Sequence, residues 1–340
     1  MKAYQINSYG NDEKLLLSDK KKPEIDSTSI IVKVHAASIN PVDYKIREGK
    51  AKIVLRYKMP LTLGHDFSGV VQEVGTEVSQ FKMGDQVYGR IPISGSSKDE
   101  PGTFQEFVKV GENDIAKIPK NLNLSQAAAV PLAGLTAYQG LYDWIKLRKN
   151  EQILITGGAG GVGHIAIQLA LNTGATVYTT VSDEGIKFLD KHDNINFINY
   201  KKDKFYDQLT NLDAVYDMQG SEDLNHAFDV VKTGGRVATI SYLPTPSFAK
   251  ISKRGKFFEL ILAIATYKLR KKAKNKKITF DSFLTLSSNK ELTELTELIE
   301  NENLVVDIQR IYQQNEINEA VNEVMKGKVK GKIVVEFDWN

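Results

Sequence analysis

The stretch ITGGAGGVGHIAIQLALNTGATVYTTVS, Ile155 to Ser182, decides the fold. A β-branched run leads into a glycine-rich turn, an apolar segment with helical spacing follows, and a second β-branched run ends the stretch. The glycines fit the pattern G-x-G-x-x-G, which permits a tight turn, close approach of backbone to a pyrophosphate, and close packing of helix on strand. We predict a βαβ unit whose turn binds a dinucleotide; the alternative is a tight turn without a ligand. The predicted phosphate-binding residues are Gly158, Ala159, Gly160, Gly161, Val162 and Gly163.

The same alternation of strand and helix continues downstream and predicts a parallel, doubly wound sheet. Its expected strands are Gln152–Thr156, Thr176–Val181, Phe197–Ile198, Ala214–Asp217 and Arg236–Ile240. The first third of the chain differs, because short β-branched runs separated by glycine and charged turns are typical of a β-barrel-like domain. We expect a late strand, in GKIVV, to return to this first domain and make it discontinuous.

Composition narrows the class of protein. A chain of 340 residues favours two domains, and 41% hydrophobic with 26% charged residues is ordinary for a globular protein. A net charge of +3 argues against a general nucleic-acid binder, and the absence of cysteine excludes disulfides and thiolate zinc sites. The first 17 residues lack a signal-peptide core, and the run Phe257–Tyr267 is too short to span a bilayer. We therefore expect a cytoplasmic protein without stable membrane insertion.

The end of the second strand selects between the two nicotinamide dinucleotides. NAD binders place an acid there, on the ribose 2′-hydroxyl, and NADP binders avoid that charge. Here the strand ends at Ser182, with Lys187 and Tyr200 expected at the same corner, so we predict NADP(H). Asp183 follows one position later and keeps NAD open as the alternative.

Seven segments together resemble the medium-chain dehydrogenase/reductase superfamily, on its zinc-independent NADPH:quinone oxidoreductase side, whose relatives include chains called zinc-type alcohol dehydrogenase-like. They are AASINPVDYKIREG (36–49), LGHDFSGVVQEVG (63–75), MGDQVYG (83–89), GTFQEFVKV (102–110), AAAVPLAGLTAYQGL (127–141), GGAGGVG (157–163) and GKIVV (331–335). The resemblance implies an α/β protein with a GroES-like β-barrel catalytic domain (1–123 and 306–340) and a Rossmann NADP(H)-binding domain (124–305). It also implies a nicotinamide held in the cleft between the domains, and a homodimer.

The resemblance further implies site residues. Asn40 and Tyr44 are the expected catalytic residues, near the nicotinamide and the substrate oxygen. Thr136 is expected near the nicotinamide ribose and phosphates, and Lys332 near the cofactor end. Gln219 and Ser241 follow strands of the doubly wound sheet, where ligands bind. Each of these residues also has a purely structural interpretation, such as a packed aromatic for Tyr44 or an exposed lysine for Lys332.

Zinc-dependent members resemble this chain at His65 and Asp66, but they also use cysteine ligands that this sequence lacks. We expect no metal, and His65 as a structural histidine. The predicted function is NADPH-dependent hydride transfer to a small quinone or α,β-unsaturated carbonyl. The alternatives are a zinc-dependent alcohol dehydrogenase and a non-catalytic NADPH-binding sensor or structural protein.

Residues 250–277 form a basic segment that none of these motifs explains. Its apolar residues Phe257, Phe258, Leu260, Ile261, Ile264 and Leu269 are expected to form one broad helical face. We weigh a helix packed on the Rossmann domain with a solvated basic tail, a subunit contact or lid, and a surface for an anionic membrane.

Overall fold

A parallel sheet organises residues 136–285, one of the two units into which the chain divides. The other unit comprises residues 1–135 and 286–340. The computed structural model describes residues 1–50, 57–91, 102–252 and 255–339. Residues 253 and 254 of the basic segment lie outside the described residues.

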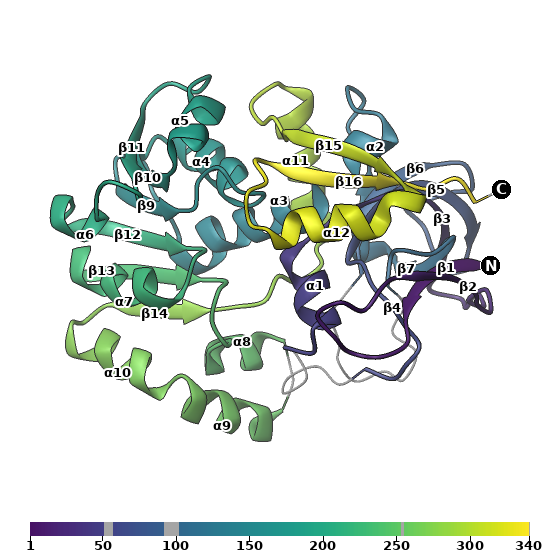
Figure 1. The fold of residues 1–340 in the computed structure, drawn as a ribbon, viewed down its shortest axis with the longest axis horizontal. Coiled ribbons are helices and arrows are strands. Elements are labelled where there is room, and N and C mark those ends of the chain that lie inside the picture. Colours follow the sequence, from purple (N-terminus) through teal and green to yellow (C-terminus); the bar gives the residue numbers. More distant parts are fainter. Residues whose placement is uncertain (51–56, 92–101, 253–254, 340) are drawn as a thin grey trace. The chain divides into compact units, whose positions relative to one another are not determined.

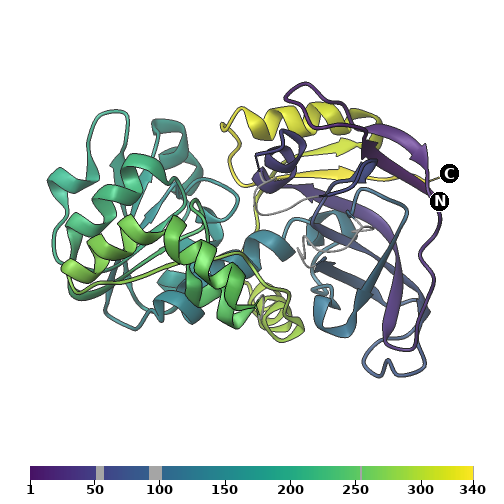
Figure 2. The ribbon, with the colours of Figure 1, turned by 90° about the horizontal axis from the view of Figure 1, so that it is seen from below.

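The sheet of the 136–285 unit has the order β11-β10-β9-β12-β13-β14 among the described residues, and all its neighbouring strands are parallel. Numbered within the unit, this is the order 3-2-1-4-5-6 of a Rossmann sheet, which confirms the predicted fold class. Helices lie on both faces of this sheet (Figures 1 and 2). The strands are β9 (Gln152–Thr156), β10 (Thr176–Val181), β11 (Ile195–Asn199), β12 (Leu212–Asp217), β13 (Val231–Thr239) and β14 (Thr279–Ser282).

The predicted bounds of β9 and β10 are confirmed, whereas β11 and β12 extend further than predicted. The expected strand at Arg236–Ile240 was wrong at both ends, because β13 begins at Val231 and ends at Thr239. The helical elements of this unit are η2 (Gln139–Ile145), α4 (Gly163–Asn172), α5 (Asp183–Leu189), α6 (Phe205–Gln208), α7 (Ser221–Val230), α8 (Pro246–Ile251), α9 (Lys256–Ala265) and α10 (Tyr267–Asn275), and α3 (Pro131–Tyr138) leads into it.

The basic segment forms two helices rather than one. Gly255 precedes α9 with a φ of +86°, and buried Thr266 separates α9 from α10. Leu262 and Leu269 are buried, while Phe257 and Ile264 are exposed. The single broad face expected from the sequence is therefore wrong for Leu269, which packs inward with the core around Leu224 and Phe228.

The other unit is built mostly from antiparallel strands, and only its β15 and β16 pair in parallel among the described residues. Its larger sheet has the order β15-β16-β3-β5-β6-β8 with β7 also on β3, and its smaller sheet has the order β2-β1-β4. The late strand β16 pairs antiparallel with β3, so Ile333 lies opposite Ile39 and the two distant segments share one sheet (Figure 1). The strands are β1 (Lys2–Ile6), β2 (Leu16–Asp19), β3 (Ser29–Ile39), β4 (Leu61–Thr62), β5 (Asp66–Val74), β6 (Gln86–Arg90), β7 (Phe107–Gly111), β8 (Ile115–Lys117), β15 (Ile308–Gln313) and β16 (Lys332–Glu336).

Short helices complete this unit and extend it beyond the domain boundaries expected from the sequence. Residues 124–135 and 286–305 cluster here, because α2 packs on β3 and β5, and α11 packs on β8. The helices are α1 (Pro41–Arg47), η1 (Glu112–Asp114), α2 (Leu124–Ala127), α11 (Asn289–Glu300), η3 (Gln314–Glu316) and α12 (Ile317–Met325).

Candidate functional site

The glycine turn joins β9 to α4 and leaves no room for side chains at two of its glycines. A Cβ on Gly163 would lie 2.8 Å from the Cα of Gly158, and a Cβ on Gly158 would lie 2.7 Å from Cδ1 of Ile167. Real Cβ atoms essentially never approach other heavy atoms within 3.0 Å. The N–H of Gly157 donates to Oγ1 of Thr180 at 3.0 Å, which fastens the turn to β10.

The backbone of this turn offers donors at the beginning of α4. Within the described part of the chain, no protein group accepts from the N–H groups of Ala159, Gly161 or Val162. These groups lie at the positive end of the helix dipole, where an anion is stabilised. A Cβ on Gly160 would meet only the Gly157 carbonyl oxygen, at 3.3 Å, so this side of the turn is open. The turn therefore fits the phosphates of a dinucleotide.

Asp217, at the end of β12, ties together the carboxyl ends of three neighbouring strands. Its carboxylate accepts from Thr156 Oγ1 of β9 at 3.1 Å and from Thr239 Oγ1 of β13 at 2.7 Å. It also accepts from the Gly220 N–H at 3.0 Å. Burial raises the pKa of Asp217, and these hydrogen bonds oppose the rise. Sequence reasoning missed Asp217 because its partners lie on other strands.

Gln219 and Ser241 follow β12 and β13, and the structure places both at this edge of the sheet. The Gln219 amide lies beside Gly157, where it would collide with any added Cβ. The hydroxyl of Ser241 donates to the carbonyl oxygen of Met218 at 2.5 Å. The structure therefore brings Gln219 to the glycine turn, and ties Ser241 to the loop that follows Asp217.

Ser182 follows β10 and caps α5. Its Oγ accepts from the Gly185 N–H at 3.3 Å and donates to Glu184 at 2.6 Å. This hydrogen bond, with further help from Lys201, lowers the pKa of Glu184 to about 2. Asp183 Oδ1 instead accepts from Asn199 Nδ2 at 2.7 Å and Lys202 Nζ at 3.0 Å. The acid that kept NAD open is thus engaged by its own neighbours.

The surroundings of the other predicted cofactor residues of this unit do not test whether they contact a cofactor. Lys187 and Tyr200 are exposed. Thr136 is buried; its Oγ1 lies 2.6 Å from Oγ1 of Thr285, and its carbonyl oxygen accepts from the Tyr216 hydroxyl at 2.7 Å. These contacts anchor Thr136, and its approach to a cofactor stays a prediction.

A buried polar cluster in the other unit surrounds Asn40, directly before α1. Lys332 Nζ, on β16, donates to Asn40 Oδ1 at 2.6 Å. Asn40 Nδ2 donates to Asp66 Oδ2 at 3.0 Å and to the Ser38 carbonyl oxygen at 3.2 Å. Asp66 also accepts from the Ser38 hydroxyl at 2.7 Å and from the Ser38 N–H at 3.0 Å. The pairing of β16 with β3 brings Lys332 and Asn40 together.

Opposite charges balance inside this cluster. Burial lowers the pKa of Lys332, and the carboxylates of Asp66 and Asp43 oppose that change. Burial raises the pKa of Asp66, and Lys332 opposes that change. Lys332 is only 4% exposed, so the structure corrects the interpretation of this residue as a solvent-exposed lysine. Its aliphatic stem and ammonium form part of the interior.

Asp43 bridges Asn40 and His65 within the same unit. One carboxylate oxygen accepts from the Asn40 N–H at 2.7 Å, and the other lies 2.6 Å from Nδ1 of His65. An ionised carboxylate only accepts, so this pair places a proton on Nδ1. Tyr44 is the next residue of α1 and is half-buried against the core, and burial raises the pKa of its phenol.

Two family models match the chain. The alcohol dehydrogenase GroES-like domain matches residues 26–120, and the zinc-binding dehydrogenase model matches residues 195–335. The structure of the quinone oxidoreductase from Coxiella burnetii is similar over 99% of both chains, with 33% identity and a TM-score of 0.83. The chain belongs to the medium-chain dehydrogenase/reductase superfamily.

Two curated relatives of this medium-chain dehydrogenase/reductase are named as a reductase and an oxidoreductase. It is 39% identical over 252 residues to the 2-methylene-furan-3-one reductase of Solanum lycopersicum, over 72% of this chain and 63% of the relative. The match thus spans less than two thirds of the tomato protein. It is 31% identical over 361 residues to the mitochondrial NAD(P)H oxidoreductase RTN4IP1 of Mus musculus, over 98% of this chain and 89% of the relative.

The donor set of this dehydrogenase/reductase does not fit the zinc that one family description names. Asp66, the acid that follows His65, is occupied by Ser38 and Asn40. The ammonium of Lys332 already supplies a buried positive charge to this cluster, and a second cation would be repelled. No group of three or more His, Cys, Asp or Glu in the described ranges is arranged to hold a metal ion.

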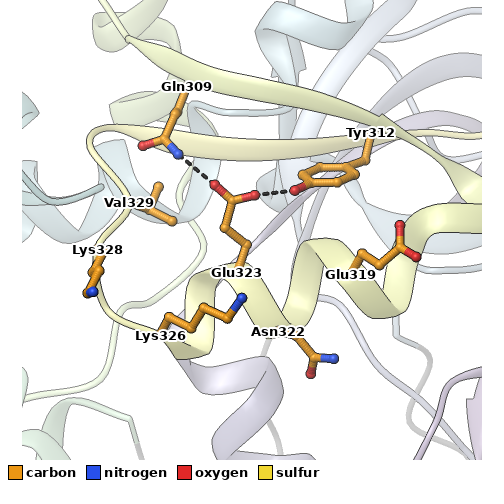
Figure 3. A pocket seen from close by; sticks show the side chains of 8 residues that line it. All are labelled: Gln309, Tyr312, Glu319, Asn322, Glu323, Lys326, Lys328 and Val329. Carbon is orange, nitrogen blue, oxygen red and sulfur yellow. Dashed lines mark hydrogen bonds between the residues drawn. The ribbon is translucent and has the colours of Figure 1, made fainter.

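A cavity of about 480 Å³ lies between β15 and α12. Figure 3 shows Glu323 at its centre, where it accepts from Gln309 Nε2 at 2.6 Å and from the Tyr312 hydroxyl. None of the predicted site residues lines this cavity. Its central acid is satisfied by neighbouring side chains, so we assign it no role.

Proposed function

We propose that this chain is an NADPH-dependent oxidoreductase that transfers a hydride to a quinone or an α,β-unsaturated carbonyl without zinc. The close-packed glycine turn at the beginning of α4 carries the proposal, because it fits a pyrophosphate and rejects a side chain at Gly158 and Gly163. The relatives supply the class of reaction, since they include an enone reductase, an NAD(P)H oxidoreductase and a quinone oxidoreductase.

The residues around the turn would hold the two ends of the dinucleotide. The N–H groups of Ala159, Gly161 and Val162 would bind the pyrophosphate. The edge organised by Asp217 would present Gln219 and Ser241 to the nicotinamide half. When bound, NADPH supplies the hydride from C4 of its nicotinamide. The cofactor contributions of Thr136 and Lys332 remain part of the proposal.

The preference for NADP(H) rests on the corner after β10. Ser182 stands where an NAD binder carries an acid, and Asp183 is engaged by Asn199 and Lys202. Lys187 lies on α5 and is exposed, Tyr200 is exposed with its N–H donating to the Val181 carbonyl oxygen at 3.1 Å, and both would contact a 2′-phosphate. Dissociation constants for NADPH and NADH test this: wild type should favour NADPH, and S182D should shift the ratio toward NADH at least about tenfold. An unchanged ratio in S182D would remove this corner from cofactor selection.

Tyr44 and Asn40 have different roles in this proposal: Tyr44 contacts the substrate and Asn40 positions α1. The Tyr44 phenol, whose pKa burial raises above its usual value, would donate to the substrate oxygen on which negative charge develops. Asn40 remains a predicted catalytic residue, but its Oδ1 and Nδ2 are already bonded to Lys332, Asp66 and Ser38. The geometry therefore favours Asn40 as a positioning residue at the start of α1, the helix that carries Tyr44.

Steady-state NADPH oxidation with a panel of quinones, enones and aldehydes tests the proposal. We expect turnover with a quinone or an enone, unchanged after dialysis against a chelator. Tight NADPH binding without turnover of any acceptor would favour the sensor or structural alternative. Stoichiometric zinc whose removal abolishes activity would favour the alcohol dehydrogenase alternative. A cytoplasmic homodimer remains part of the proposal, and light scattering and fractionation test it.

A further inference from the structure

Helix α9 carries apolar side chains on two sides, and only one side is covered. Leu262 on α9 is buried, and Leu269 and Ala273 on α10 are buried in the core of the unit. The outward side of the segment is apolar as well. Its exposed residues are Phe257 (78%), Leu260 (58%), Ile261 (43%), Ile264 (71%) and Tyr267 (58%).

The four residues on α9 form one stripe, because they recur at intervals of three and four along that helix, and Tyr267 continues the exposed apolar surface at the beginning of α10. A large apolar side chain that is singly exposed is normal, whereas a contiguous exposed stripe marks an interaction surface. Figure 1 shows α9 and α10 as consecutive helices beyond β14. We call the outward-facing residues within 256–275 the α9–α10 face.

Cations border the α9–α10 face. Lys256, Lys268, Lys271 and Lys274 are exposed, and Lys271 Nζ lies 5.9 Å from the centre of the Tyr267 ring. Lys272 and Lys276 are instead engaged by Asp229, at 3.5 and 2.6 Å. The exposed lysines thus stand beside the apolar stripe and are available to an anionic partner.

The charge of this segment is extreme for the chain. Residues 250–277 contain 11 Lys and Arg and one acid, Glu259, a net charge of 11 − 1 = +10. The whole chain carries +3, so the remaining residues sum to 3 − 10 = −7. A positive segment on an otherwise negative protein orients the molecule toward a negative surface.

We propose that the α9–α10 face docks on the surface of an anionic phospholipid bilayer. The apolar stripe would enter the boundary between headgroups and acyl chains, and the lysines beside it would attract the anionic headgroups. The docking is peripheral: among the helices of the described residues, none is long and apolar enough to cross a membrane. This inference does not depend on the proposed catalytic function.

The positive charge of residues 250–277 favours an anionic bilayer over a second copy of the chain or a nucleic acid. A second copy seated face to face would bring two segments of +10 together, which is unfavourable. A nucleic acid would engage the cations but would leave five apolar side chains in water. A bilayer rich in anionic lipid satisfies both the charge and the apolar stripe.

Vesicle flotation of the full chain tests the proposal. We expect partitioning onto vesicles of mixed phosphatidylcholine and phosphatidylglycerol, little onto phosphatidylcholine alone, and release as salt concentration rises. K268E/K271E should weaken partitioning at least about tenfold, and F257S/I264S should do the same. An Ile264→Trp variant should show a blue-shifted emission when anionic vesicles are added.

Matched controls lie in the other unit. K21E/K120E makes the same change in net charge at two lysines whose side chains are 82% and 90% exposed. M83S removes an apolar side chain that is 69% exposed. Both should partition like the wild type, because neither lies on the α9–α10 face.

Three outcomes would overturn the proposal. The first is no binding to anionic vesicles, which would leave an acidic protein as the candidate partner. The second is equal binding by wild type and both α9–α10 variants. The third is a wild-type dimer that F257S/I264S dissociates while vesicle binding is absent, which would show that a second copy covers this face.

Discussion

Two buried carboxylates, one in each unit, show two ways in which this chain builds a polar site. Asp217 accepts from neutral donors: the hydroxyls of Thr156 and Thr239 and backbone N–H groups. Asp66 accepts from Ser38 and Asn40, and Asn40 in turn accepts from the ammonium of Lys332. Burial raises the pKa of both carboxyls. Only Asp66 has a buried cation among the groups that oppose the rise.

The kind of donor around each carboxylate indicates its structural role. Hydrogen bonds from neutral groups hold three strands in register around Asp217 and shape the edge that follows them. Charge balance around Asp66 makes the cluster beside Asn40 dependent on a residue 292 positions away. Removal of one member of a buried charged group is more costly than the loss of a neutral hydrogen bond.

Lys332→Met gives the largest expected effect. It leaves Asp66 and Asp43 without their buried cation, and we expect a loss of about 3–5 kcal/mol in the free energy of unfolding. Urea denaturation measures it. The double variant K332M/D66N should recover much of the loss, because it also removes the uncompensated charge. A K332M protein as stable as wild type would show that the ammonium does not balance this cluster.

The pH dependence of K332M follows from the pKa of Asp66. Burial already raises that pKa above 3.8, and loss of Lys332 removes a group that lowers it. A raised carboxyl pKa contributes stability that is complete below the unfolded pKa and is lost as pH rises through the folded pKa. The stability deficit of K332M should therefore grow as the pH rises above the unfolded carboxyl value near 3.8. A deficit independent of pH would contradict the charge-balance interpretation.

Asp217→Asn tests the neutral network and should cost less. In the variant, the amide N–H groups would face the hydroxyl and N–H groups that donate to Asp217 in the wild type. We expect a loss of about 2–3 kcal/mol in the free energy of unfolding. NADPH affinity should fall with stability, because Gln219 and Ser241 are attached to the same edge. Chemical denaturation and fluorescence titration measure the two effects. A D217N loss larger than that of K332M would reverse the comparison.

Gly163→Ala and Gly160→Ala separate packing from ligand binding in the Rossmann unit. The added Cβ would lie within 3.0 Å of several atoms at Gly163, but 3.3 Å from one oxygen at Gly160. We expect G163A to cost about 1–3 kcal/mol and G160A less, while both weaken NADPH binding. If G160A leaves NADPH affinity unchanged, the open side of the turn does not face the pyrophosphate.

Tyr44→Phe should have the smallest effect on stability and a specific effect on rate. The ring still packs on the core, so the change in unfolding free energy should stay below about 1 kcal/mol. Loss of a proton or hydrogen-bond donor should lower kcat by about tenfold to a hundredfold with NADPH affinity intact. An unchanged kcat would remove the Tyr44 hydroxyl from the mechanism.

Sequence reasoning reached the parts of the molecule that local pattern determines. The glycine turn and the bounds of β9 and β10 follow from residues close together in the chain. The contact between Lys332 and Asn40 depends on the register of β16 against β3, which no local pattern contains. Asp217 escaped notice for the same reason, because its partner Thr156 lies 61 residues away.

The basic segment shows a second feature that the sequence pattern does not predict, which is the side of a helix that packs on the protein. Helical periodicity identifies apolar faces but does not say which face meets the protein. The structure turns Leu262 and Leu269 inward and leaves Phe257 and Ile264 exposed. The break at Thr266 was equally hidden, because threonine is tolerated within helices.

Transfer of deuterium from NADPH labelled at both C4 hydrogens of the nicotinamide tests directly whether this chain transfers a hydride without zinc. The purified chain, dialysed against a chelator, would be incubated with labelled NADPH and an α,β-unsaturated ketone, with a quinone in parallel. We expect a ketone that carries deuterium on its β-carbon, or quinol formed in equal amount to NADP+. Tight NADPH binding with no deuterated ketone and no quinol would contradict it.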